Sequence, residues 1–384
     1  RYACRTAGSP SQAPGGRKLL WSAQVGAPVD EKLAAEWDLK EGGRLSSPVV
    51  AGSVAIAAAT DQHRVSAVDT SSGKPLWTFN AGGSIDCPPT LHDGLCLFGS
   101  RDGYVYCLRA SDGELVWLFC AAPRYERIVA FWQLESMWPV VGGVLVYEGL
   151  AYFGVGRHAG ADGGITVCAV EPASGNLVWS QQAKDYEGIP DVLTAADGTV
   201  QMASYRFDAQ TGENGEAGKA LLRGGRLGIL NDAWYQRPIA MRKNLQQWQA
   251  SGRVSAQMLA FHEDATCGFL ACTSVAGGDG KMSGDAVLFA KDVKDGKDWS
   301  HKMTNEARLR GIAIAADRAY VAGLLPIGKE KELDYVVQAY SLTDGKLLAE
   351  TKIAGSPVHD GVAIAGGRVY LSTHDVRVVV LVLK

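Results

Sequence analysis

The chain has 384 residues, of which 47% are hydrophobic and 21% charged, with 46 Gly and 14 Pro. This composition provides a large core and enough turn residues for an all-β protein. The formal net charge of −3 lacks the basic footprint of a nucleic-acid-binding protein, and no run reaches the ~20 apolar residues that cross a bilayer, so we expect neither a nucleic-acid partner nor a membrane span.

Residues 1–18 read as a tail or linker, and residues 19–384 as a single domain with an insertion at 213–252. The sequence starts with Arg1 instead of Met, which indicates a processed or trimmed chain. We expect part of a larger exported protein or assembly, located in the periplasm or outside the cell.

A repeat is visible at residues 67–77, 107–117 and 169–179, which read AVDTSSGKPLW, CLRASDGELVW and AVEPASGNLVW. Each copy ends in a Trp four residues after a Gly, and Gly73 and Gly113 lie 40 residues apart. Short strands repeated at this period predict the blades of a β-propeller, each with four strands, A to D.

The repeat continues along the chain, with its Trp persisting as Trp299 and replaced by Ala349. Eight blades are favoured over seven, with 226–250 as a degenerate eighth. The last blade lacks a fourth strand, which residues 19–25 or 33–39 would supply to close the ring. The blades are expected near 44–80, 83–120, 139–182, 189–225, 254–303, 308–350 and 357–384.

The A-x-D-x-x-x-G-x-x-x-W unit resembles the repeat of the PQQ-like propeller superfamily, which includes quinoprotein alcohol dehydrogenases and outer-membrane assembly lipoproteins. Residues 43–117 look most similar to PQQ-like modules of large exported bacterial proteins. The resemblance covers residues 40–384, weakest between 213 and 256. It implies a propeller whose repeat Trp residues pack between blades, and it does not specify an activity.

In the quinoprotein enzymes, the resemblance implies a quinone stacked on a Trp, covered by a vicinal Cys pair and placed beside a calcium ion. This sequence has no adjacent cysteines and no C-x-x-C-H haem motif. We therefore expect neither PQQ nor another cofactor, and no metal site, although a calcium ion in the central funnel stays open.

Among the eight cysteines, Cys96 and Cys107 flank a turn at Ser100–Gly103. We expect them to face each other across a hairpin, either as a cross-strand disulfide or as two buried thiols.

The predicted A–B and C–D turns are short, whereas the long insertions fall on the D–A and B–C connections. In a propeller these two kinds of connection share one face, so we expect function on that loop-rich face. The insertions are 121–138, 154–164, 213–252, 274–284 and 324–334.

Charged residues precede the innermost strands and are expected to ring the central funnel. They would hold a cation or a polar ligand such as a sugar, or else pair with one another as a solvated rim. These residues are Arg44, Asp86, Glu135, Asp191, Asp232, Arg310, His359 and Asp360.

The segment 229–237 adds Trp234, Tyr235 and Arg237 beside Asp232, a mixture that suits a saccharide; the alternative is a degenerate blade. Arg157 and His158 match G-x-G-x-x-[GA] by letter only, because they lie between strands and not before a helix. With Arg127, they are expected to project over the funnel.

Two classes of function follow. The first is an exported binding or scaffold module for a glycan or a protein partner. The alternative is a polysaccharide lyase or hydrolase, with a quinone-dependent dehydrogenase expected least. In the lyase or hydrolase, Asp191 or Asp232 would be the acid, and the other catalytic candidates are His359, Tyr235, Arg237 and Arg310.

Overall fold

The structure is a computed structural model. It describes residues 18–27, 44–130, 133–183, 193–202, 205–215, 222–223, 248–250, 254–256, 258–262, 265–270, 274–276, 281–283, 286–291, 293–304, 306–328 and 332–383.

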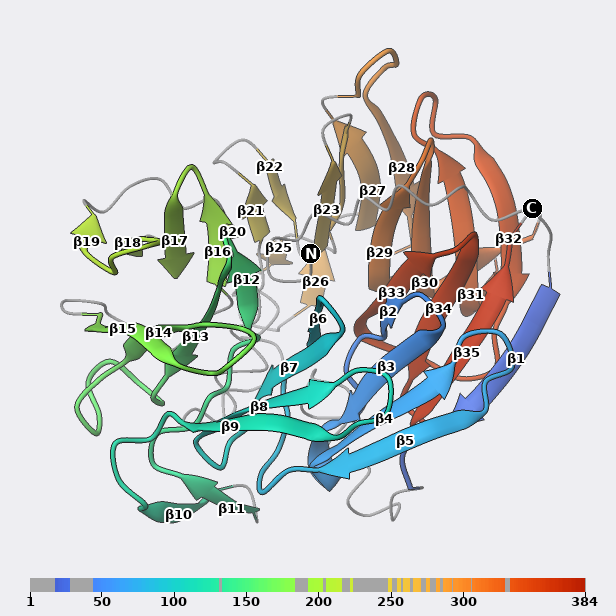
Figure 1. Cartoon of the computed structure of the whole chain (residues 1–384). Coiled ribbons are helices and arrows are strands. Elements are labelled where there is room, and N and C mark those ends of the chain that lie inside the picture. The colour runs from blue at the N-terminus through green and yellow to red at the C-terminus, as the bar shows by residue number, and fades with distance from the viewer. Residues whose placement is uncertain are drawn as a thin grey trace.

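The described residues form seven four-stranded antiparallel sheets that follow one another around a ring (Figure 1). The first holds β2 (Val49–Ala51), β3 (Val54–Ala59), β4 (Arg64–Asp69) and β5 (Pro75–Asn80), with the short 3-10 helix Thr60–Gln62 between β3 and β4. The second holds β6 (Thr90–His92), β7 (Leu95–Gly99), β8 (Tyr104–Arg109) and β9 (Leu115–Cys120). The third holds β12 (Leu145–Tyr147), β13 (Leu150–Val155), β14 (Thr166–Val170) and β15 (Leu177–Gln182).

The fourth sheet holds β16 (Leu193–Ala196), β17 (Thr199–Met202), β18 (Tyr205–Asp208) and β19 (Asn214–Gly215). The next in chain order holds β23 (Met258–His262), β24 (Ala265–Leu270), β27 (Ala286–Lys291) and β28 (Trp299–Met303). It is followed by β29 (Arg308–Ala315), β30 (Arg318–Ile327), β31 (Glu332–Ser341) and β32 (Leu347–Lys352). The last sheet holds β33 (Pro357–Ala365), β34 (Arg368–Thr373), β35 (Arg377–Val382) and β1 (Lys18–Gln24).

Between the fourth and fifth of these sheets, a three-stranded sheet holds β20 (Leu222–Arg223), β21 (Trp248–Ala250) and β22 (Val254–Ala256). Only β21 falls within residues 226–250, the region expected to hold a degenerate blade, while β20 and β22 lie on either side of it; eight blades stay a prediction. The described residues also form two hairpins: β10 (Arg127–Ala130) with β11 (Gln133–Ser136), and β25 (Ser274–Ala276) with β26 (Lys281–Ser283).

The ring closes through the N-terminal segment, as predicted for residues 19–25. Strand β1 pairs antiparallel with β35, and the innermost strands β2 and β33 of the first and last sheets contact each other. Trp21 in β1 follows a β-bulge opposite Val380, as Trp77 follows one in β5. Strand β1 is therefore a copy of strand D, supplied from the far end of the sequence.

The Trp of each copy lies against the next sheet. The indole Nε1 of Trp77 donates to the carbonyl of Ala110 at 3.0 Å, and a Cβ on Gly113 would lie 2.7 Å from the Trp77 ring. Gly113 has φ +76°, which also favours glycine. The same contacts recur for Trp21, Trp117, Trp179 and Trp299.

Ala349 occupies the Trp position in β32, where it pairs with Ala339. In the following sheet, strands C and D are β35 and β1, which are not consecutive in the chain. No direct C–D turn joins them, so the glycine turn that receives an indole in the other sheets has no counterpart in this one.

In the six sheets whose A–B turn is described, that turn is two residues long, and short turns were predicted. Asp93 and Gly94 have φ of 45° and 78°, and Asp197 and Gly198 have φ of 51° and 69°. Two consecutive positive φ values are typical of the type I′ turn, whose twist matches that of the flanking strands.

The pairing predicted for Cys96 and Cys107 is wrong by one residue. Cys96 lies opposite Leu108, and Cys107 lies opposite Leu97. A slip of one residue reverses the face, so Cys96 packs in the core between the first and second sheets and Cys107 in the core between the second and third. Both are buried free thiols.

No helix in the described part of the chain is long and apolar enough to cross a membrane.

Candidate functional site

The insertion between β9 and β12 builds the hairpin β10–β11, which lies outside the four-stranded sheets at the lower edge of Figure 1. The insertion between β24 and β27 likewise carries the hairpin β25–β26. The insertion predicted as a loop at 324–334 is mostly strand, because β30 and β31 stay paired as far as Ile327 and Glu332.

A buried chain of four charged side chains fixes the hairpin β10–β11. Arg101 Nε donates to Asp86 Oδ2 at 2.6 Å, and Arg101 Nη1 donates to Glu135 Oε1 at 3.1 Å. Arg157 Nη2 donates to Glu135 Oε2 at 2.8 Å and to the carbonyl of Ser136 at 2.9 Å. None of the four charged side chains is more than 7% exposed.

This cluster, the ion quartet, joins the second sheet, the hairpin β10–β11 and the third sheet on the loop-rich face. Asp86 precedes β6, Arg101 lies in the turn between β7 and β8, and Glu135 lies on β11. Arg157 follows β13 in the third sheet. Two carboxylates thus balance two guanidinium groups.

Burial alone would lower the pKa of Arg101, but the charges of Asp86 and Glu135 raise it above its ordinary value. Removing one member of such a buried pair leaves an uncompensated charge, which costs about 3–5 kcal/mol. The predicted ring residues Asp86 and Glu135 therefore do meet, joined by Arg157 from the predicted 154–164 loop, but as a buried network and not as a solvated rim.

Gln133, at the start of β11, ties the hairpin to the first sheet. The Ser84 hydroxyl donates to Gln133 Oε1, and Gln133 Nε2 donates to the carbonyl of Asp61 at 3.4 Å. His63 Nε2 also lies 3.4 Å from Gln133 Oε1. The hairpin is thus held by groups from three successive sheets.

Arg44 is buried where the chain approaches β2, and its carbonyl accepts from the amide of Thr60 at 2.9 Å. The pKa of the nearby Asp61 is raised by burial, against the opposing effect of the Arg44 charge. Arg44 thus lies on the loop-rich side of the first sheet, as predicted, beside a carboxylate that the sequence did not single out.

Arg310 and the pair His359 and Asp360 lie where the innermost strands β29 and β33 begin, as predicted. Each site is irregular: a register shift falls at Arg310 in β29, and Asp360 has φ 60° within a shift in β33. The hydroxyl of Ser47 donates to the carbonyl of Asp360, which joins β33 to the first sheet.

Arg127 and His158 do not join the ion quartet. The Arg127 guanidinium lies 4.8 Å from the centroid of the Tyr125 ring. The His158 Nδ1 accepts from the amide of Gly160 at 2.9 Å, so this ring bonds to its own loop.

The other predicted site residues, which are Asp191, Asp232, Trp234, Tyr235 and Arg237, lie outside the described residues.

Arg101 was missed because Ser100–Gly103 was interpreted only as a tight turn. The available signal was an Arg in a B–C turn, the kind of connection that shares the loop-rich face. The anchoring role of Gln133 had no comparable signal, since a single Gln in an insertion has no pattern.

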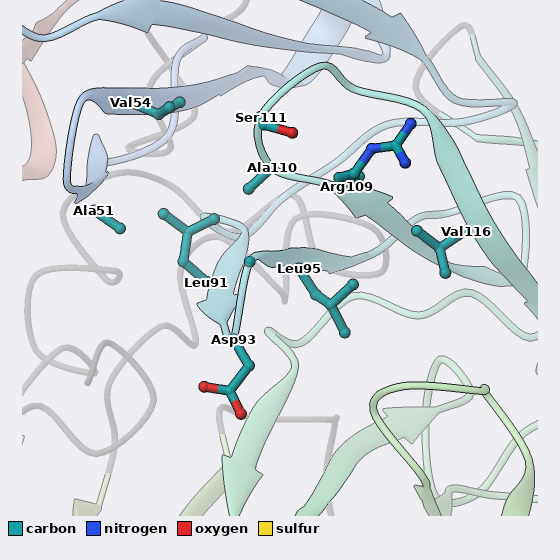
Figure 2. Close-up of a pocket in the computed structure, with 10 residues that line it drawn as sticks. Ala51, Val54, Leu91, Asp93, Leu95, Arg109, Ala110, Ser111 and Val116 are labelled. Atoms are coloured by element: carbon teal, nitrogen blue, oxygen red, sulfur yellow. The ribbon is translucent and has the colours of Figure 1, made fainter.

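A groove of about 500 Å³ lies on the opposite face, that of the short turns (Figure 2). Leu91, Leu95 and Val116 line it together with Asp93 and Arg109. Both charged groups have partners, His92 at 3.4 Å and Asp112 at 2.7 Å. The groove therefore offers chiefly apolar surface.

The residues do not fit the quinone site that the resemblance implies. Trp77, Trp117 and Trp179 are engaged between sheets, and the sequence has no vicinal cysteines. Within the described ranges, no group of three His, Cys, Asp or Glu side chains is arranged to hold a metal ion. The expectation of no cofactor stays a prediction.

The family model described as outer membrane protein assembly factor BamB matches residues 12–129. The assembly factor BamB of Nitrosomonas eutropha is 24% identical over 161 residues, which cover 42% of this chain and 35% of that protein. The match thus spans about a third of the relative's length.

Solved structures share the fold. The computationally designed Ika8 protein is 10% identical, with 96% of this chain and 100% of that chain covered and a TM-score of 0.55. The quinohemoprotein alcohol dehydrogenase of Comamonas testosteroni is 13% identical, with 98% and 78% covered and a TM-score of 0.51. Together with the repeat, these matches support a β-propeller fold and a similarity to the PQQ-like repeat family.

Proposed function

We propose that this chain is a non-catalytic protein-binding module, a scaffold or assembly factor of the periplasm, and that it binds its partner on the loop-rich face. The similarity to a protein named as an outer membrane protein assembly factor supports this class. The observation that carries the choice of face is the hairpin β10–β11, which is anchored by buried charges and exposes apolar side chains.

The charges of the loop-rich face favour a protein over a glycan. A saccharide site needs polar groups that are available to hydroxyls. Asp86, Arg101, Glu135 and Arg157 are instead buried and bonded to one another. Exposed Tyr125, Val129 and Leu134 are the kind of surface that a protein partner buries.

The test is photo-cross-linking in cells that produce the protein natively. A benzophenone amino acid replaces Tyr125 or Asp162 on the loop-rich face, or Asp93 or Ser111 on the short-turn face as matched controls. We expect one recurring protein adduct from the first pair and none from the second. Adducts from the short-turn face alone, or none from any position, would contradict the proposal.

A further inference from the structure

Strand β10 has an open edge. Among the described residues it belongs to a two-stranded sheet whose other member is β11. Its sequence, Arg-Ile-Val-Ala, contains no Pro or Lys of the kind that usually protects an edge from pairing.

The register shows which backbone groups face that edge. The amide of Ser136 on β11 donates away from the hairpin, to the carbonyl of Arg101 at 2.7 Å. Ser136 and Arg127 are therefore a pair without mutual hydrogen bonds, and so is the pair Leu134 and Val129 two residues on. The N–H and C=O groups of Arg127 and Val129 thus point to the open edge.

The side chains of the hairpin divide into two faces. Ile128 and Glu135 are paired and turn toward the sheets, where Glu135 joins the ion quartet. Val129 and Leu134 are paired on the other face, 76% and 50% exposed. This outward apolar pair lies beside the same edge, whose backbone groups have no partner among the described residues.

Arg127 adds a charge at the start of the edge. Its guanidinium lies over the Tyr125 ring. Its Nε is buried and has no hydrogen-bond partner in the described part of the chain, so a ligand would meet the charge through the outer Nη groups. A carboxylate is the group that complements it.

We propose that β10 receives an extended segment of a partner protein as an added strand. The segment hydrogen-bonds to Arg127 and Val129, covers Val129 and Leu134 with apolar side chains, and places an acidic residue at Arg127. Strand addition gives affinity through the main chain and specificity through alternate side chains. The ion quartet holds the hairpin in place beforehand, which lowers the entropic cost of binding. This inference rests on the proposed function and names its binding element.

The test uses the full chain and a short synthetic peptide of alternating Val and Thr that ends in Asp, with binding measured by fluorescence anisotropy. The decisive variant is Val129→Pro, which removes an amide that points to the open edge but no bond between β10 and β11. Val129→Thr is its matched control, since it keeps the amide and the β-branched shape.

We expect Val129→Pro to weaken peptide binding about tenfold. Val129→Thr should bind the peptide much more tightly than Val129→Pro, because it keeps the backbone hydrogen bond at residue 129. Replacing the terminal Asp of the peptide by Lys should also weaken binding to the parent chain, and Arg127→Gln should abolish that difference. Unchanged hydrogen exchange in β11 shows that the Pro variant keeps its hairpin. Equal binding by the parent chain and Val129→Pro, or no binding of the peptide to the parent chain, would overturn the inference.

The two proposals can fail separately. If cross-links from Asp162 still capture a partner while the partner binds Val129→Pro as tightly as the parent chain, the scaffold function stands and the added strand is wrong. If no cross-link forms on the loop-rich face, the scaffold function fails as well.

Discussion

Replacing Arg101 by Met tests whether the ion quartet is the anchor of the loop-rich face. Met keeps the length and apolar stem of the side chain but removes the charge that bonds to Asp86 and Glu135 at 2.6 and 3.1 Å. Because the site is buried, the loss leaves carboxylate charge without this cation, and we expect the free energy of unfolding to fall by about 3–5 kcal/mol.

The matched control is Arg109→Met in the same sheet. Arg109 bonds to Asp112 at 2.7 Å, about as closely as Arg101 bonds to Asp86, but both side chains are about half exposed. An exposed pair contributes little because water already solvates its charges, so this variant should unfold like the parent chain.

Urea unfolding followed by Trp fluorescence measures both variants, and hydrogen exchange reports on β11. Arg101→Met should also expose the amides of Glu135 and Ser136 to faster exchange. If Arg101→Met is no less stable than Arg109→Met, the quartet does not anchor the hairpin and the reasoning is refuted.

Three further predictions concern ring closure, pH and cysteine state. Trp21→Ala should lower the free energy of unfolding by about 3–5 kcal/mol, since it removes the side chain that packs between the last and first sheets. Leu19→Ala, at an exposed position, should have little effect, and equal losses of the two variants in urea unfolding would contradict the role of β1 in closure. Burial raises the pKa of Asp61 above 3.8, so the stability that this carboxyl contributes is full below pH 3.8 and is lost as the pH rises through the raised pKa. Asp61→Asn should therefore be more stable than the parent chain at neutral pH but not at acidic pH, and thermal melts at the two pH values test this. Cys96 and Cys107 should both be alkylated when the chain is denatured without reductant. If mass spectrometry finds them joined by a disulfide and not alkylated, the register between β7 and β8 is wrong.

Much of the fold could be predicted because the repeat is local. The Gly and Trp spacing of 67–77 and its copies fixes a turn and a strand, and closure requires a strand from the N-terminus. The copy at β1 carried a weaker signal: Leu20 and Trp21 match Leu76 and Trp77, but without the glycine turn that marked the other copies.

The site was predicted less well because its contacts cross the sequence. The loop-rich face followed from which connections are long, and the place of Asp86 before the innermost strand β6 followed from strand order. Glu135 instead lies on β11 of the added hairpin. Their partner Arg101 did not, because pairing across two sheets depends on side-chain geometry. The cysteine pairing failed for a smaller reason, since a turn one residue longer reverses the face of every side chain that follows.

The central claim is that a partner protein lies on the loop-rich face and along β10. Hydrogen exchange on the chain alone and bound to the partner captured by cross-linking tests it most directly. We predict slower exchange at the amides of Arg127 and Val129, with no change at Asp93 and Gly94. Protection at the short turns, with β10 exchanging as in the free chain, would contradict it.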